Sequence, residues 1–298
     1  PIFLKPPHKR LVMFARRRRT RLSIAIPASL TSGVPHLREK TYLIGLVGRA
    51  AAVFRVEEIL IYNDLPGVDQ KRDVELMASI LSYMETPQYL RKRLFKVDPK
   101  LRYVGILHPL RTPHHPTAGR LRDLRDGELR EGVVVASGEG WSMVDVGVER
   151  PLRVKERLEV GERVTVRVSR RKGAVLLRLL RRGEVKAYWG YRVRVSKSLG
   201  ELLTRRRFDL SIATSRRGRL LLEVIEPIRE RWTSAERVLI AFGSPRMGLA
   251  EILREEGLTL EDVFDFTVNT IPGQGCETVR TEEAIYSTLA ILNLLIKD

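Results

Sequence analysis

The chain has 298 residues, 43% of them hydrophobic, which is enough for two domains that each bury a core. Its formal net charge of +18 indicates a polyanionic partner, most often a nucleic acid, with a merely soluble, heat-adapted surface as the alternative. A single cysteine, Cys276, excludes an internal disulfide and a Cys-based zinc site. No apolar run is long enough to span a bilayer. We therefore expect a cytoplasmic protein without a membrane or metal partner.

The first third of the chain alternates strand and helix signals. The basic start, residues 1–21, lacks the apolar core of a signal peptide. Apolar β-rich runs at 23–28 and 57–62 predict strands, and helical periodicity predicts helices at 37–54 and 69–84. This strand, helix, strand, helix order is typical of an α/β fold with a mostly parallel sheet.

A turn-rich connector at 109–116 ends this pattern, and short β-rich runs follow it. Five such runs suggest a small barrel of the OB-like kind. They lie at 132–136, 141–148, 163–168, 174–180 and 185–191. Residues 163–207 hold fifteen basic residues against two acids, whereas 208–298 hold ten against fifteen, so the basic surface should be separate from the rest.

The last hundred residues return to alternation, with strands predicted at 209–213, 220–225, 237–242 and 264–268 and helices at 247–256 and 281–296. The final helix carries an apolar stripe that must bury against the sheet or a second subunit. The simplest architecture is an α/β domain formed by residues 1–116 and 196–298, with the barrel of residues 117–195 inserted between them.

Two loops combine glycine with proline directly after a predicted buried strand: Phe242–Gly248 and Asn269–Gly275. Glycine allows close approach of the backbone to a ligand, and proline limits the entropy lost on binding. Taken alone, each loop fits an ordinary strand-to-helix turn better than a ligand site. Neither has the spacing of a Walker A or a dinucleotide-binding fingerprint.

As a pair, residues 240–248 (IAFGSPRMG) and 271–284 (IPGQGCETVRTEEA) resemble the cofactor-binding motifs of SPOUT methyltransferases. Residues 49–64 (RAAAVFRVEEILIYND), Pro113-His-His115 and 131–135 (EGVVV) resemble the subgroup with an inserted OB-like barrel, which includes archaeal proteins and a spindle-associated eukaryotic relative. The resemblance covers nearly the whole chain.

The resemblance implies a C-terminal trefoil knot, a rare exception to unknotted topology, with S-adenosylmethionine bound inside it and S-adenosylhomocysteine as product. It also implies a homodimer with each pocket near the subunit interface. The matching positions for cofactor binding are Phe242, Gly243, Gly248, Ile271, Gly273, Gly275 and Thr278. The residues that would shape the loops are Ser244, Pro245, Pro272 and Gln274.

Arg49 is the candidate catalytic residue. A uridine or pseudouridine ring nitrogen must lose a proton when it takes a methyl group, and a cation would stabilise the resulting anion. Arg49 lies in a predicted helix among small residues, where a charge is costly without a purpose, and it matches an arginine of other SPOUT branches. The alternative is an ion pair with Glu57 or Glu58 at the helix end.

Several other side chains have two interpretations. His114 and His115 lack a third metal ligand and fit a solvated joint or a phosphate contact. Cys276 fits packing better than nucleophilic catalysis, because no activating base is evident. Residues 16–19 (RRRR) fit a phosphate contact or a disordered arm. Four aromatic residues on the predicted barrel strands would stack bases or fill the core: Trp141, Tyr188, Trp189 and Tyr191.

The resemblance implies an S-adenosylmethionine-dependent RNA methyltransferase acting on folded RNA, most plausibly ribosomal, at N3 of a uridine. In this interpretation the barrel docks the RNA and the knot holds the methyl donor. One alternative is a non-catalytic RNA-binding or ribosome-assembly factor that keeps the fold. A DNA-binding protein is a third interpretation, but the sequence has no helix-turn-helix or zinc signature.

Overall fold

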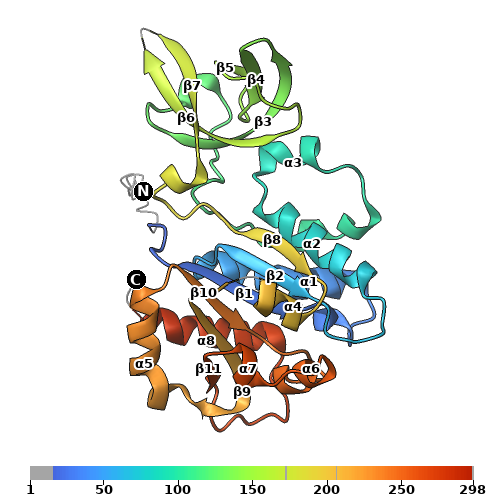
Figure 1. Ribbon diagram of the computed structural model, residues 1–298. Helices are drawn as coiled ribbons and strands as arrows, with labels where there is room; N and C mark the ends of the chain where they lie inside the picture. Colours follow the sequence, from blue (N-terminus) through green and yellow to red (C-terminus); the bar gives the residue numbers. More distant parts are fainter. Residues whose placement is uncertain (1–15, 172, 206, 297–298) are drawn as a thin grey trace, which may run out of the picture.

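A six-stranded, entirely parallel sheet forms the larger of two lobes (Figure 1). The computed structural model describes residues 16–171, 173–205 and 207–296. The strand order is β11-β9-β10-β1-β2-β8, so the predicted mostly parallel α/β fold is confirmed. The strands are β1 (Arg21–Pro27), β2 (Glu58–Tyr62), β8 (Arg192–Ser196), β9 (Leu210–Leu220), β10 (Arg237–Ala241) and β11 (Phe266–Asn269).

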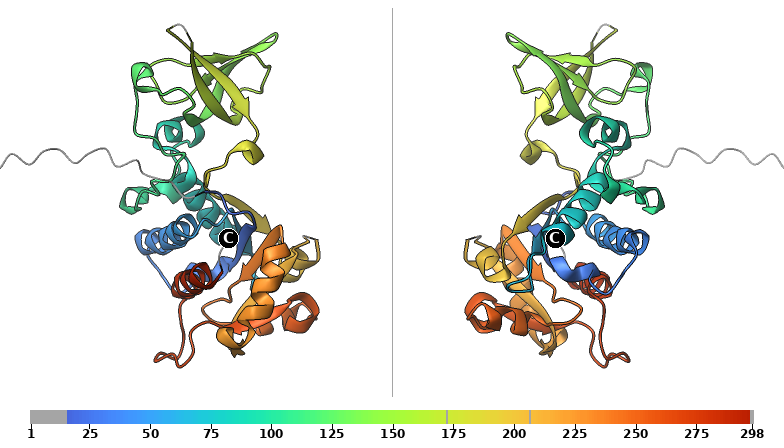
Figure 2. Two further views of the ribbon diagram at one scale, coloured as in Figure 1. Left: turned by 90° about the vertical axis from the view of Figure 1, so that its left-hand side faces the viewer. Right: turned by 90° about the vertical axis from the view of Figure 1, so that its right-hand side faces the viewer.

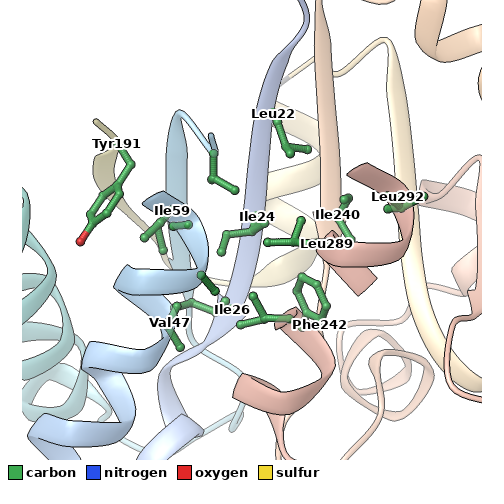
Figure 3. Packing of buried hydrophobic residues seen from close by; sticks show 14 of the residues in the cluster. Leu22, Ile24, Ile26, Val47, Ile59, Tyr191, Ile240, Phe242, Leu289 and Leu292 are labelled. Atoms are coloured by element: carbon green, nitrogen blue, oxygen red, sulfur yellow. The ribbon is translucent and has the colours of Figure 1, made fainter. Parts of the chain in front are cut away.

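Helices cover both faces of this sheet, because alternate strand side chains point to opposite sides. Ile24 and Ile26 of β1 join one apolar cluster, and Ala25 joins the other. The first face, shown in Figure 3, packs on α1 (Leu37–Val53), α2 (Lys71–Glu85), α5 (Leu221–Ser234) and α8 (Thr281–Leu295). The second packs on α4 (Leu199–Arg205), α6 (Leu249–Glu255) and α7 (Leu260–Val263). Within the described residues, no helix is long and apolar enough to cross a membrane.

The smaller lobe is a nearly closed antiparallel sheet with the order β5-β4-β3-β6-β7, in which β5 packs against β7. Its interior is a separate valine- and leucine-rich cluster. The predicted barrel is therefore confirmed at this level, while its OB-like identity stays a prediction. The strands are β3 (Leu129–Gly138), β4 (Trp141–Asp145), β5 (Leu152–Val154), β6 (Arg163–Arg171) and β7 (Ala174–Leu180).

Both ends of the chain build the parallel sheet. Strands β1 and β2 precede the barrel, and β8 to β11 follow it. The sheet resumes at Arg192, four residues before the predicted start of the third segment, because β8 pairs with β2. Short helical segments fill the connection into the barrel, namely α3 (Gln88–Leu94), η2 (Pro99–Leu101), η3 (Val104–Ile106) and η4 (Leu121–Asp123).

Two predicted strands are wrong. Of the predicted strand 220–225, Leu220 ends β9 and residues 221–225 begin helix α5, whose buried Leu221, Val224 and Ile228 follow helical spacing. A short apolar run fits a buried strand and a buried helix equally well, so the period could not distinguish them. Residues 185–191 form no strand beyond a single bridge at Ala187, because the bulky side chains there anchor the chain between the lobes.

The apolar stripe of the last helix is buried inside the chain. Ile285, Leu289 and Leu292 are at most 3% exposed and pack in the cluster on the first face of the sheet. The apolar stripe therefore packs against the sheet of its own chain and gives no support for a dimer.

A buried junction of Glu85, Glu131 and Arg163 joins the two lobes. Arg163 of β6 donates to both carboxylate oxygens of Glu85, at the end of α2, over 2.6 and 3.1 Å. Its Nε donates to Glu131 of β3 over 2.7 Å. Thr165 and the Trp189 indole also donate to Glu131. Because every carboxylate has charged or N–H partners, the junction fixes the barrel against the sheet.

The two histidines of the connector belong to this junction, so the predicted solvated joint is wrong. His114 is fully buried, and its Nε2 lies 2.8 Å from the Glu85 carbonyl and 3.1 Å from Glu85 Oε1. His115 Nε2 lies 2.7 Å from the same carbonyl. A Cβ at Gly190 would lie 2.5 Å from the His114 ring, so this glycine makes room for the imidazole.

Replacing Arg163 with methionine should lower the free energy of unfolding by about 3 kcal/mol, because two buried carboxylates lose their cation. Arg167 lies on the same strand but is exposed, so Arg167→Met should change the free energy of unfolding by less than about 0.5 kcal/mol. Urea unfolding followed by circular dichroism measures both. Equal stability of the two variants would show that the junction does not hold the lobes together.

Acid should destabilise the protein in two stages. Burial lowers the pKa of His115 from 6.5 to about 3, so the unfolded chain binds this proton first and stability falls below pH 6.5. Arg163 and His114 hold the pKa of Glu85 well below its usual 4.5 against the opposing effect of burial, so its contribution is lost only at lower pH. His115→Gln should remove the first stage alone. Urea midpoints measured against pH would contradict this if both proteins lost stability equally between pH 6.5 and 4.5.

Candidate functional site

A cavity of about 680 Å³ opens at the carboxyl ends of β9, β10 and β11. We call it the strand-end cavity. Open parallel sheets bind ligands at this edge, because the loops that follow the strands converge there. The volume is in the range of small-molecule pockets. Both views in Figure 2 place the barrel and the loop between β11 and α8 at opposite ends of the molecule.

The first wall of the cavity is the loop 242–248 between β10 and α6. The hydroxyl of buried Tyr62 donates to the Phe242 carbonyl over 2.6 Å, and Thr281 Oγ1 donates to the Gly243 carbonyl over 3.0 Å. Within the loop, the Ser244 amide donates to the Met247 carbonyl over 2.8 Å. A Cβ at Gly243 would lie 3.1 Å from that carbonyl oxygen, so the turn is tight. The loop is therefore fixed from β2 and from α8.

The second wall is the segment 270–280 between β11 and α8. Asn269 fixes its start, since its Oδ1 accepts from the Ile271 amide and its Nδ2 donates to the Arg216 carbonyl, both over 2.9 Å. Gln274 Nε2 donates to the carbonyls of Cys276 and Glu277 over 2.8 and 3.0 Å. Gly273 has φ of +63°, which favours glycine. The chain thus folds back on itself before α8 begins.

The third wall is the end of β9, residues 214–219, which sequence reasoning missed. The pairing of β11 with β9 passes from Ala213 to Arg219 and skips the residues between them. A Cβ at Gly218 would lie 2.6 Å from the Val268 backbone, so only glycine permits this contact. Arg216 Nη1 donates to the Glu277 carbonyl over 3.0 Å and ties this wall to the second. A glycine after polar residues at a strand end was the available signal.

Eight of the eleven predicted cofactor positions line the strand-end cavity: Phe242, Gly243, Ser244, Pro245, Gly248, Ile271, Gln274 and Thr278. Pro272, Gly273 and Gly275 lie in the same segment but outside the lining. The two loops that the sequence paired therefore meet in space. Cys276 is exposed and is also outside the lining.

The cavity suits a nucleoside. Its lining combines apolar surface from Phe242, Met247 and Phe264 with carboxylates, including Glu251 and Glu261, and with four arginines, Arg216, Arg217, Arg219 and Arg246. Backbone groups of glycine-containing loops can read the edge of a flat base. No cluster of metal-ligating side chains occurs in the part of the chain that the structure describes.

Arg49 does not line the strand-end cavity. Its Nη1 donates to the carbonyls of Pro109 and Leu110 over 2.9 and 3.1 Å. The alternative ion pair between Arg49 and the acids at the end of its helix does not form. Glu57 is held by Arg17 instead, through two 2.6 Å hydrogen bonds. The guanidinium also lies close enough to Tyr286 of α8 to oppose the effect of burial on the pKa of that phenol.

Most of the other predicted RNA contacts serve internal packing instead. Arg17 pairs with Glu57, and Arg18 is 5% exposed with its Nη2 donating to Asn293 Oδ1 over 2.6 Å. Tyr188, Trp189 and Tyr191 are at most 4% exposed, because they fill the space between the lobes. Trp141 is half-buried, with the Arg153 guanidinium 5.4 Å from its ring centre. The basic start at residues 1–15 lies outside the described residues.

Comparison with known proteins gives a consistent result. The family model described as "Putative RNA methyltransferase" matches residues 21–292. The chain is 34% identical to 28S rRNA (uridine-N(3))-methyltransferases of Drosophila melanogaster and Homo sapiens over 91% of its length, and spans 61% and 77% of those proteins. An uncharacterized protein of Haloarcula marismortui is also 34% identical, with 91% of this chain and 98% of that protein covered.

The family match includes β1, the whole barrel lobe and the three walls of the strand-end cavity. Relatives of equal similarity come from animals and from an archaeon. The chain belongs to this family of RNA methyltransferases.

Proposed function

We propose that the protein uses S-adenosylmethionine to methylate a base of ribosomal RNA, at N3 of a uridine. The observation that carries this proposal is the convergence of both glycine-containing loops on one cavity at the carboxyl edge of the sheet. Relatives that share 34% identity over 91% of the chain are uridine-N(3) methyltransferases of 28S rRNA, which supports the choice of base and atom.

The donor would occupy the strand-end cavity and supply an electrophilic methyl group on a sulfonium. Main-chain groups of 242–248 and 271–278 would hold its adenine, with Phe242 and Ile271 against the ring. The nearby carboxylate of Glu251 would favour the positive charge. Positioning of the two reactants accounts for much of the acceleration expected from such a site.

Two further features are part of the proposal. The contact of Thr281 with Gly243 ties the start of α8 to the loop after β10, an arrangement that a C-terminal trefoil knot would produce. A homodimer would cover exposed apolar side chains on neighbouring helices, Tyr42 and Val53 of α1 and Leu294 of α8. Since Arg49 is outside the cavity of its own chain, its catalytic role requires the dimer to bring α1 of one subunit to the cavity of the other.

The alternative is an RNA-binding assembly factor that keeps the fold without transferring methyl groups. It predicts RNA affinity but no saturable binding of S-adenosylmethionine. Calorimetric titration with S-adenosylmethionine and S-adenosylhomocysteine separates the two. Saturable micromolar binding supports the methyltransferase, whereas no binding with RNA affinity intact favours the assembly factor.

Thr281→Val should weaken S-adenosylhomocysteine binding about fivefold to tenfold, because the Gly243 carbonyl loses its donor and the loop loosens. Thr233→Val is the matched control, since that hydroxyl bonds to a carbonyl of its own exposed helix. Calorimetry should show control affinity equal to that of the unmodified protein. Equal affinity in both variants would remove the loop 242–248 from the proposed binding site.

Arg49→Ala should lower the rate of methyl transfer by at least about a hundredfold while S-adenosylhomocysteine still binds. Single-turnover transfer of a labelled methyl group to ribosomal RNA measures the rate. Because Arg49 also bonds to two carbonyls, the unfolding free energy must be measured in parallel. Unchanged transfer would end its assignment as a catalytic residue, and loss explained by unfolding would make it structural.

A further inference from the structure

The outer surface of the β6–β7 hairpin carries two arginines that face each other without a counter-charge. Arg167 of β6 is directly opposite Arg178 of β7. Both are exposed, whereas Val166 and Val168 on either side of Arg167 point into the barrel. Like charges opposite each other on antiparallel strands destabilise a sheet. Neither guanidinium has an ion-pair partner among the residues that the structure describes.

The same surface continues with small, polar and apolar side chains. Ser169 is opposite Leu176, which is 48% exposed, and Arg171 is opposite Ala174. These residues and the pair Arg167 and Arg178 form what we call the hairpin face. An apolar side chain between guanidiniums offers a base contact beside phosphate contacts, the combination that single-stranded nucleic acid requires.

The hairpin face leads into a cleft of about 700 Å³ between the lobes. Arg181, Arg192 and Arg194 line this cleft and are exposed. The cleft is also lined by five carboxylates: Glu85 and Glu131 are held by Arg163, Glu184 accepts from the Arg181 amide over 2.7 Å, and the other two are Glu156 and Glu162. These acids balance the five arginines of the lining, so the cleft as a whole adds no net charge, and its contribution next to the hairpin face is the exposed pair Arg181 and Arg192.

We propose that the hairpin face, continued by the exposed Arg181 and Arg192, forms the docking surface for the RNA strand, with Arg167 and Arg178 on successive phosphates. This inference rests on the proposed function and names where its substrate binds. Arginine suits the role because its planar fork bonds to phosphate oxygens in pairs. Phosphates bound there would also relieve the repulsion between the two guanidiniums.

The test compares two double variants with equal change in net charge. Arg167→Glu with Arg178→Glu reverses the hairpin pair. Lys71→Glu with Arg72→Glu reverses two exposed cations at the start of α2, where acids suit the helix dipole. Binding of a labelled large-subunit ribosomal RNA transcript is measured against salt concentration, and S-adenosylhomocysteine binding is measured in parallel.

The hairpin variant should bind RNA at least about tenfold more weakly. The negative slope of its log affinity against log salt concentration should decrease in magnitude by about one to two. The α2 variant should stay within about twofold of the unmodified protein, and both should bind S-adenosylhomocysteine normally. RNA binding by the hairpin variant equal to that of the α2 variant overturns the proposal. The proposal would also be overturned if polyglutamate displaced the labelled RNA from the unmodified protein as effectively as unlabelled RNA does. The surface would then be a general anion site.

Failure of this inference and failure of the proposed function can be told apart. If the unmodified protein transfers no methyl group but the hairpin variant loses RNA affinity, the docking surface stands and the methyltransferase proposal fails. If the unmodified protein methylates RNA and the hairpin variant binds and methylates equally well, only the docking surface fails.

Discussion

The guanidinium of Arg163 is shared by two buried carboxylates, Glu85 from the sheet lobe and Glu131 from the barrel. Each acid would be costly to bury alone, and together they would repel each other without the cation between them. The barrel is inserted between α2 and β8, so its two connections to the sheet must be held in register. His114 and Trp189, one from each connection, donate to the same carboxylates. The position of the barrel therefore depends on one arginine and on the residues that satisfy its partners.

The strand-end cavity depends on a different constraint, the parallel order of the sheet. Strands β9, β10 and β11 are adjacent only because the chain leaves the sheet after each strand and returns in the same direction. Their carboxyl ends then meet at one edge, and three loops from separate parts of the sequence become walls of one cavity. Tyr62 of β2 reaches across to the Phe242 carbonyl, so the loop after β10 is also fixed from the opposite half of the sheet.

Local patterns in the sequence predicted what local chemistry determines. Short apolar runs identified β1, β2 and β10, and glycine with proline identified the two loops that line the cavity. Features set by tertiary packing could not be predicted in this way. The wall from Thr214 to Arg219 depends on a change of register with β11, and the burial of His114 depends on Gly190 and Glu85. The carbonyl partners of Arg49 are sixty residues away in the chain, and no periodicity reports such contacts.

The separation of the two proposed binding surfaces fits a polymeric substrate. The barrel joins the sheet at the end where β8 begins (Figure 1). The strand-end cavity lies where β9, β10 and β11 end. A strand of five to seven residues rises about 3.3 Å per residue, so roughly 20 Å of sheet lies between the two.

A small metabolite could not contact both surfaces, whereas a folded RNA easily spans such a distance. The charges agree with this division, since residues 163–207 are strongly basic and residues 208–298 are acidic. In the proposed function an RNA would be attracted to the first region and not to the second, so the charge distribution would favour RNA binding at the barrel end of the sheet.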